Sequence, residues 1–155
     1  IILDACVAQI EGSPTLYDNV QQAVDAAAPG DLVKISGYCA GVNTYADLRQ
    51  HVYLDKSITL RGGYNDDFTD WNPELYSTTL NAGGLGRVIY ITGSISPTLE
   101  NLTITGGDAR DVGVGAGVYA ITAMATISGC QIVNNIAQRG GASTWVRVIR
   151  YYKTT

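Results

Sequence analysis

The densest group of potential metal ligands in this sequence is a short acidic stretch near its middle. Asp66, Asp67 and Asp70 stand within eight residues, together with two asparagine amides. Carboxylate and amide oxygens are the ligands that calcium prefers. The stretch could therefore hold a Ca²⁺ ion, although its spacing is not that of an EF-hand loop. We expect instead a hydrophilic loop folded back by Phe68 and Trp71, and no cofactor, with a Ca²⁺ site as the alternative.

Two other groups of charged residues are candidates for catalysis. They are Asp55 with Lys56, and Asp108 and Asp111 around Arg110. Glycoside hydrolysis requires two carboxylates about 5 to 10 Å apart, and a lyase requires calcium-binding carboxylates beside a basic residue. We interpret both groups as solvated loop charges and expect a protein without catalytic residues. A polysaccharide-degrading enzyme is the main alternative.

Three tyrosines are candidates for ligand binding. Tyr90 and Tyr119 occupy equivalent places in two similar phrases, and Tyr53 extends the series. Rings that follow one another on the outside of a sheet could stack against sugar faces and bind a polysaccharide without hydrolysing it. The alternative is that the rings stack on one another and stabilise the sheet exterior.

The three cysteines predict one disulfide. Cys6 and Cys39 flank a predicted helix, so a bridge between them would fasten that segment to the first core strand. Such a bond persists in oxidising compartments and predicts an extracellular or cell-surface protein. Cys130 falls at an apolar repeat position and is expected to be a small buried hydrophobe.

The elements that must position these residues are repeats. The phrase at 88–92 returns at 117–121, and the phrase at 99–106 returns at 127–134, with shifts of 29 and 28 residues. Apolar and polar residues alternate within each phrase, which indicates strands with one buried face. Copies that run in one direction must pair in parallel. The sequence therefore predicts a ladder of parallel strands.

An older copy of the repeat lies upstream. Val52-Tyr53-Leu54 precedes Ile58-Thr59-Leu60-Arg61-Gly62-Gly63, and the second phrase ends on the same Gly-Gly as Leu102-Thr103-Ile104-Thr105-Gly106-Gly107. We align the two Gly-Gly pairs, which places Leu60 beside Ile104.

One short helix is expected before the first strand. Ala23, Val24, Ala27 and Ala28 recur at helical spacing until Pro29-Gly30 ends the pattern. The helix is expected to cover the first strand layer, whose apolar side chains would otherwise meet water.

These motifs carry a family resemblance over residues 6–141. The run from Val20 to Ile35, with its Pro-Gly-Asp-Leu-Val turn, resembles the opening of pectin-lyase-like proteins. The Leu-Thr-Ile-Thr-Gly-Gly and Gly-Val-Tyr phrases are similar to those of secreted bacterial repeat proteins, of which the chain resembles the N-terminal part. The resemblance implies an all-β, right-handed parallel β-helix with a short N-terminal capping helix. It implies no single activity, because lyases, hydrolases and adhesins share this fold.

Composition and charge limit the remaining possibilities. The chain has 155 residues, 46% hydrophobic content and a net charge of −4, which suits one domain and argues against nucleic acid as a partner. No apolar run reaches the roughly 20 residues of a membrane span. We expect one domain over 1–155, divided into a cap at 1–31, β-helix rungs at 32–141 with a loop insertion at 64–79, and an atypical strand or arm at 142–155.

The ends of the chain differ in charge. All 14 acidic residues lie at or before Asp111, with 6 basic residues in that part, whereas 4 basic residues and no acid follow. Opposite charges at the two ends of a stack favour head-to-tail association into a homo-oligomer or filament. Trp145, Val148 and Tyr151 are the predicted contacts, so the expected function is that of a structural or adhesive module. The alternatives are a frayed tail and a fragment of a longer surface protein.

Overall fold

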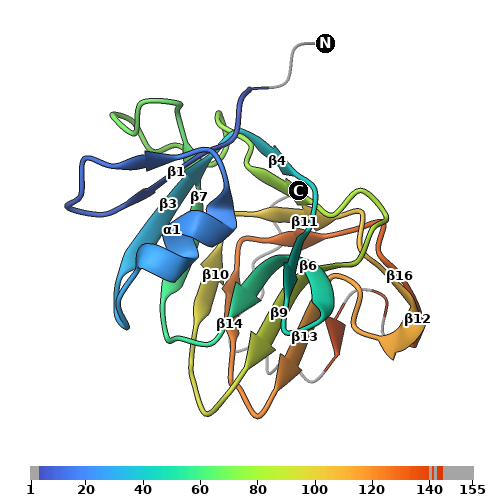
Figure 1. Ribbon diagram of the computed structural model, residues 1–155. Helices are drawn as coiled ribbons and strands as arrows, with labels where there is room; N and C mark the ends of the chain where they lie inside the picture. Colours follow the sequence, from blue (N-terminus) through green and yellow to red (C-terminus); the bar gives the residue numbers. More distant parts are fainter. Residues whose placement is uncertain (1–3, 140, 142, 145–155) are drawn as a thin grey trace.

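The computed structural model describes residues 4–139, 141, 143 and 144, and these residues are mostly β with one short helix (Figure 1). Two large sheets and one smaller sheet are built mainly from parallel strands. The all-β prediction is therefore confirmed. No helix among the described residues is long and apolar enough to cross a membrane.

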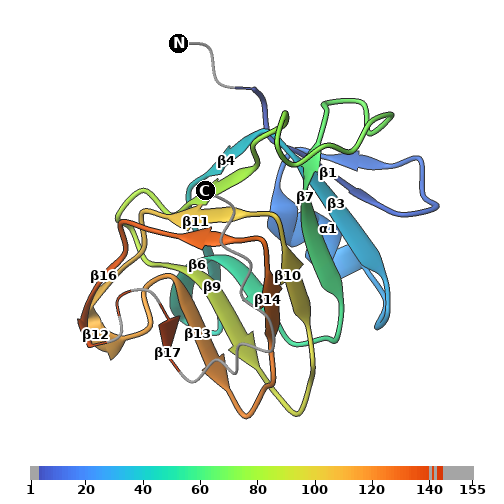
Figure 2. The ribbon, with the colours of Figure 1, turned by 180° about the vertical axis from the view of Figure 1, so that it is seen from behind.

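The first sheet has the order β14-β10-β7-β3-β1-β2, and Figure 2 labels its strands from β14 to β1. β1 pairs antiparallel with β3, and β2 pairs antiparallel with β1. The bounds are β1 Val7–Ile10, β2 Leu16–Tyr17, β3 Leu32–Ser36, β7 Thr59–Tyr64, β10 Thr98–Glu100 and β14 Thr126–Ser128.

The second sheet has the order β15-β11-β8-β4, and the third has the order β17-β13-β9-β6-β5. The second sheet comprises β4 Tyr38–Ala40, β8 Thr79–Asn81, β11 Thr103–Thr105 and β15 Gln131–Ile132. The third comprises β5 Asn43–Tyr45, β6 Leu48–Leu54, β9 Arg87–Thr92, β13 Val118–Ile121 and β17 Ser143–Thr144. A separate pair joins β12 Asp108–Val114 to β16 Ile136–Arg139.

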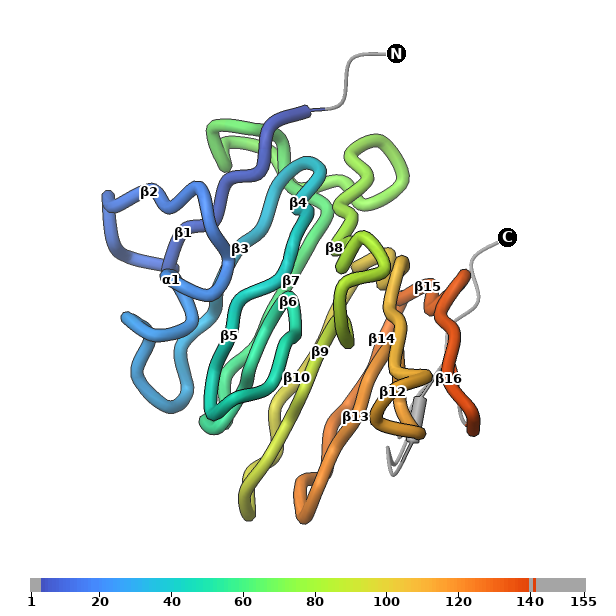
Figure 3. The backbone as a smooth tube through the Cα atoms, turned by 45° about the vertical axis from the view of Figure 1, so that its right-hand side comes forward, coloured from blue at the N-terminus to red at the C-terminus, as the bar shows by residue number. Residues whose placement is uncertain are grey.

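The chain visits these three sheets in the same order four times. We call each visit a coil: coil 1 covers 32–54, coil 2 covers 59–92, coil 3 covers 98–121, and coil 4 comprises the described residues from 126 to 144. Figure 3 shows the coils side by side, from the blue end, where the helix lies, to the orange and red end. Neighbouring parallel strands lie about 4.8 Å apart, so equivalent residues form columns along the stack.

The columns that point inward make the core. Val33 pairs with Leu60, Leu60 with Leu99, and Leu99 with Ile127, and all four side chains are at most 1% exposed. Burying each such side chain contributes about 1.5 to 3 kcal/mol. The 28-residue shift predicted between 99 and 127 is confirmed, as is the 29-residue shift that pairs Tyr90 with Tyr119.

Two details of the predicted repeat are wrong. The phrase at 99–106 is two strands, β10 and β11, that belong to different sheets and meet at Asn101, whose φ is +53°. The left-handed backbone turns the chain, so Leu99 and Leu102 both point inward despite their odd spacing. The equivalent turn in coil 4 is Gly129, with φ +62°.

The upstream alignment is also wrong. Leu60 pairs with Leu99 and not with Ile104, whose partner in coil 2 is Leu80. An insertion follows β7 in coil 2, so the second strand of that coil comes 15 residues after the first strand ends. The Gly-Gly pairs look alike in sequence but occupy different corners of the coil.

The predicted helix is confirmed as α1, Val20–Ala26. Asn19 caps it by accepting a hydrogen bond from the backbone N–H of Gln21 at 2.8 Å. Val20, Ala23 and Val24 are buried in the core, and α1 packs on β1 and β6 at the first coil. The helix therefore covers the apolar end of the stack, as its sequence predicted.

Candidate functional site

The predicted tyrosines form a continuous strip on the third sheet. Tyr53, Tyr90 and Tyr119 pair in register on β6, β9 and β13, with ring centroids 5.4 Å apart at each step. Tyr45 of β5 extends the strip, with its centroid 4.2 Å from that of Tyr53. We call these four residues the tyrosine strip. The stacking alternative describes its geometry well, because each ring lies against a neighbouring ring.

The strip offers ring edges to a ligand more than open ring faces. Tyr90 lies between Tyr53, at an interplanar angle of 7°, and Tyr119, at 49°. The guanidinium carbon of Arg87 lies 4.5 Å from the Tyr119 centroid and 5.6 Å from that of Tyr90. Burial lowers the pKa of Arg87, which donates from Nε to the Val114 carbonyl at 3.1 Å. Stacking and cation–π contact therefore involve the faces of Tyr53 and Tyr90 that sugar binding would need, whereas Tyr45, 43% exposed, stacks only on Tyr53 among the described residues.

A polar groove of about 660 Å³ lies at the corner between the first and second sheets. One wall is the insertion of coil 2, and the floor comes from the corners of coils 3 and 4. We call this the corner groove; its lining residues are Pro73, Glu74, Tyr76, Ser77, Thr78, Asn101, Leu102, Thr103, Ser128, Gly129 and Gln131.

The insertion is held to the body by contacts with the end of β7. Trp71 Nε1 donates to the Gly62 carbonyl at 3.1 Å, and the Asn72 amide donates to the Gly63 carbonyl at 2.8 Å. A Cβ atom on Gly63 would lie 2.9 Å from Pro73, and the φ of Gly63 is +93°, so glycine is required there. Arg61, which pairs with Glu100, lies 5.8 Å from the Trp71 ring. These contacts fix the wall of the groove relative to its floor.

The structure does not bring the acidic residues of the insertion together. The described part of the chain contains no group of three His, Cys, Asp or Glu residues placed to share a metal ion, so the structure does not place Asp66, Asp67 and Asp70 as one set of carboxylate ligands. Asp67 accepts hydrogen bonds from the amide and hydroxyl of Thr69, which lower its pKa. Asp70 accepts from the Tyr76 hydroxyl at 3.1 Å. These carboxylates organise the loop that walls the corner groove.

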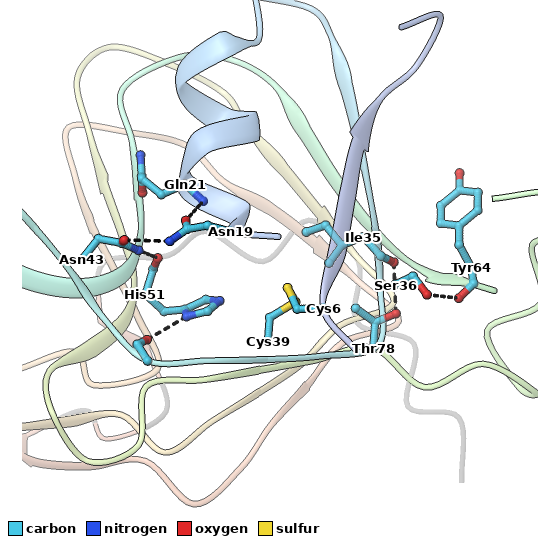
Figure 4. Close-up of a disulfide and its surroundings, with 11 residues drawn as sticks. Cys6, Asn19, Gln21, Ile35, Ser36, Cys39, Asn43, His51, Tyr64 and Thr78 are labelled. Atoms are coloured by element: carbon cyan, nitrogen blue, oxygen red, sulfur yellow. Dashed lines mark hydrogen bonds between the residues drawn. A yellow bond between two sulfur atoms is a disulfide. The ribbon is translucent and has the colours of Figure 1, made fainter. Parts of the chain in front are cut away.

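The disulfide between Cys6 and Cys39 is confirmed, with a Cα–Cα distance of 4.7 Å (Figure 4). It fastens the segment before α1 to β4, where Ala5 and Tyr38 also form a parallel bridge. Cys130 is free and buried, as predicted, and burial raises its pKa to about 11. It is therefore an unreactive core side chain.

A small hollow of about 100 Å³ adjoins the disulfide. His51 lines it with a side chain that is 5% exposed, and its Nδ1–H donates to the Gly41 carbonyl at 2.8 Å. Its Nε2 has no hydrogen-bond partner among the described residues. Burial lowers the pKa of His51, so the ring is neutral at pH 7.

The charged groups that are candidates for catalysis make structural contacts. Lys56 Nζ donates to the carbonyls of Val24, Asp25 and Ala27 at 2.7 to 3.0 Å, at the C-terminal end of α1. Arg110 pairs with Asp108 at 2.6 Å, and this pairing lowers the pKa of Asp108 to about 2. Lys56 is therefore a helix cap and not a free loop charge.

The predicted self-association contacts Trp145, Val148 and Tyr151 lie outside the described residues.

Sequence reasoning missed Tyr45, Arg87 and the corner groove. Tyr45 joins the strip through a hairpin whose Ala46 and Asp47 turn has positive φ at both positions, yet Ala-Asp is not a recognised turn signal. Arg87 precedes the repeated phrase and has no counterpart in it. The groove combines a loop with corners that are 23 to 58 residues away in sequence, so no local pattern could show it.

Comparisons with known proteins give no relative for this chain. No protein-family model, no curated protein and no solved structure matches it.

Proposed function

We propose that the chain is an extracellular module with a right-handed parallel β-helix fold, like secreted bacterial proteins of the pectin-lyase type, and that its function is structural or adhesive. The single observation that supports this proposal is the stack of four coils in register. Equivalent residues of all four coils pair in parallel in the first sheet, from Val33 to Ile127. Such a stack presents long surfaces at fixed spacing, which suits binding to extended partners. The disulfide supports an oxidising location.

Incubation of the full chain with neutral and acidic polysaccharides tests the proposal. We expect retention on at least one insoluble polysaccharide or cell-wall preparation, with no new reducing ends and no unsaturated uronates. Either product, formed at a rate proportional to protein concentration, would contradict a structural or adhesive function. Heat-unfolded protein at the same concentration is the control for non-specific retention.

Head-to-tail self-association is a second candidate, supported by the charges of the two ends. Residues 1–31 hold five carboxylates and no Lys or Arg, whereas the residues after Asp111 hold four basic groups and no acid. At low ionic strength the two ends of different copies should attract each other. Sedimentation at high concentration should show oligomers that dissociate in salt and that a chain lacking residues 143–155 does not form. A full-length monomer at low salt would exclude this function.

A further inference from the structure

We propose that the corner groove binds a stretch of a linear, neutral oligosaccharide. This inference rests on the proposed adhesive function, since it names the ligand class that the module would hold. The groove's volume of about 660 Å³ lies within the roughly 300 to 1,000 Å³ of small-molecule sites.

The hydrogen-bonding groups of the groove suit sugar hydroxyls. Within the described part of the chain, the lining offers side chains that make no hydrogen bond to another protein group: Glu74, Ser77, Asn101, Thr103, Ser128 and Gln131. Five of these six carry a hydroxyl or an amide, which can both donate and accept. A sugar hydroxyl has the same two capacities, so each contact can be made in either direction.

The charge of the groove favours a neutral ligand. Glu74 is the only charged residue of the lining, and the wall that carries it also contains Asp66, Asp67 and Asp70. Uronate or phosphate groups would enter a site that has negative charge and no Lys or Arg in its lining. Like charges at short range disfavour binding, so acidic polysaccharides should bind more weakly than neutral ones.

The floor of the groove favours a linear ligand. Thr103 and Gln131 pair in register on β11 and β15, so their side chains repeat along the stack at the strand spacing of about 4.8 Å. Asn101 and Ser128 lie beside the equivalent corners of the same two coils. A chain that lies along the stack would meet a hydrogen-bonding side chain of coil 3 and then one of coil 4.

A peptide suits the groove less well. Extended peptides are bound by open strand edges together with apolar side-chain pockets. The floor here consists of side chains on sheet corners, and the apolar part of the lining is small: Leu102 is 1% exposed, which leaves Pro73 and the Tyr76 ring.

Calorimetric titration of the full chain with cellohexaose, xylohexaose, mannohexaose and hexagalacturonate tests the inference. We expect at least one neutral hexasaccharide to bind at millimolar concentration or below and hexagalacturonate to bind more weakly. Thr103→Ala combined with Gln131→Ala should weaken the neutral ligand about tenfold, the effect of losing about 1.4 kcal/mol of hydrogen bonding. Glu74→Gln should reduce the discrimination against hexagalacturonate. Gln22→Ala, on the exposed face of α1, is the matched control and should change nothing.

Three results would overturn the inference: no neutral hexasaccharide binds at millimolar concentration, hexagalacturonate binds best, or the double variant retains full affinity with an unchanged melting temperature. Affinity lost in Tyr90→Ala with Tyr119→Ala, and retained in the groove variant, would place binding on the tyrosine strip instead. If no hexasaccharide binds and no polysaccharide is cleaved, only the inference about the groove ligand is rejected. Cleavage products would contradict the proposed structural or adhesive function itself.

Discussion

The two ends of the stack differ in how the outermost strand of each sheet is covered. At the end that carries α1, each sheet is covered: β1 pairs with β3, the segment around Ala5 and Cys6 is joined to β4, and β5 pairs with β6. The side-chain amide of Gln21 completes the third sheet, because it donates to the Tyr53 carbonyl at 3.1 Å and accepts from the Tyr53 amide. A glutamine side chain thus replaces the peptide group of a missing strand.

At the opposite end, coil 4 is covered less completely. β17 pairs with β13 in the third sheet, but no strand of the described residues pairs with the outer edge of β14 or β15. In a parallel ladder alternate residues turn their peptide groups to opposite sides. The backbone N–H groups of Thr126 and Gln131 donate to the carbonyls of Pro97 and Leu102, on the side of coil 3. Ile127 and Ile132 therefore direct their peptide groups outward.

The difference shows that the ladder and its ends have separate causes. The ladder follows from a repeat of apolar residues and could continue through any number of coils. Its termination requires specific groups, namely an antiparallel hairpin, a helix with its capping residues, and a disulfide. Substitutions at these groups should therefore affect one end of the molecule more than the rest.

Loss of the disulfide, which fastens the end that carries α1, should lower the free energy of unfolding more than any other change described below. Replacing Cys6 and Cys39 by Ser removes the closure of a loop with a sequence separation of 33 residues. The chain-entropy treatment assigns such a loop about 3 to 4 kcal/mol. Urea unfolding should show this loss in the free energy of unfolding. Cys130→Ser is not a suitable control, because it buries a hydroxyl. Reduction of the native protein with dithiothreitol is the suitable control, and it should lower the free energy of unfolding by the same amount. Equal stability with and without the bridge would show that hydrogen bonds alone hold this end.

Loss of the Lys56 ammonium group should have the next largest effect. Lys56→Met keeps the apolar part of the side chain but leaves three carbonyl groups at the end of α1 without their cationic donor. We expect a loss of about 2 kcal/mol, in the range for hydrogen bonds to a charged group. Arg49→Met removes an exposed cation 3.9 Å from Asp111 and is the control. It should change the free energy of unfolding little. A loss no greater than that of the control would contradict the capping role.

Protonation of His51 should weaken the same end in mild acid. Burial lowers its pKa in the folded state, so the unfolded chain, with a pKa near the ordinary value of about 6.5, binds more protons as the pH falls. Above pH 6.5 the protonation of His51 does not reduce the free energy of unfolding. Between that pH and the folded pKa, the free energy of unfolding falls with a slope of at most about 1.4 kcal/mol per pH unit. Melting curves from pH 7.5 to 5 should show this slope.

The control for this prediction is His51→Asn, whose amide can still donate to Gly41 but does not titrate. Asp18, which lines the same hollow, remains in both proteins. If the variant shows the same slope as the parent, groups other than His51 cause the pH dependence.

Hydrogen exchange should show the smallest and most local effect. We expect the amide of Ile127 on the outer edge to exchange faster than those of Leu60 and Leu99, which lie inside the first sheet. The measurement is made on a dilute sample by NMR. Protection of Ile127 that increases with protein concentration would instead show that another copy covers this edge.

The sequence predicted the parts of the fold that repeat at constant length. Tyr90 and Tyr119, or Leu99 and Ile127, could be aligned because no insertion separates their copies. Leu60 could not be aligned correctly, because the insertion after Tyr64 moved the second half of coil 2 away from the first. The division of the phrase at 99–106 into two strands was not predicted from its alternation, because one left-handed residue, Asn101, breaks the period of two.

The candidate sites were less predictable than the fold, for a physical reason. The tyrosine strip was found because in-register pairing converts a sequence repeat directly into neighbouring rings. The Lys56 cap depends on a contact between unlike segments, Lys56 with Ala27, and the corner groove on lining residues from unlike segments, such as Ser77 and Gln131. No repeat indicates which unlike segments meet, because their approach is set by the packing of the whole stack.

The corner that carries the insertion has a consequence for how such a chain can vary. Coil 1 turns this corner with Gly37, and coils 3 and 4 turn it with Asn101 and Gly129, whereas coil 2 leaves through residues 65–78 and returns in register at Thr79. The ladders on either side are undisturbed by that excursion. The length of the chain at this corner is therefore independent of the core, so foreign segments could be grafted there, in evolution or in the laboratory, without redesign of the strands.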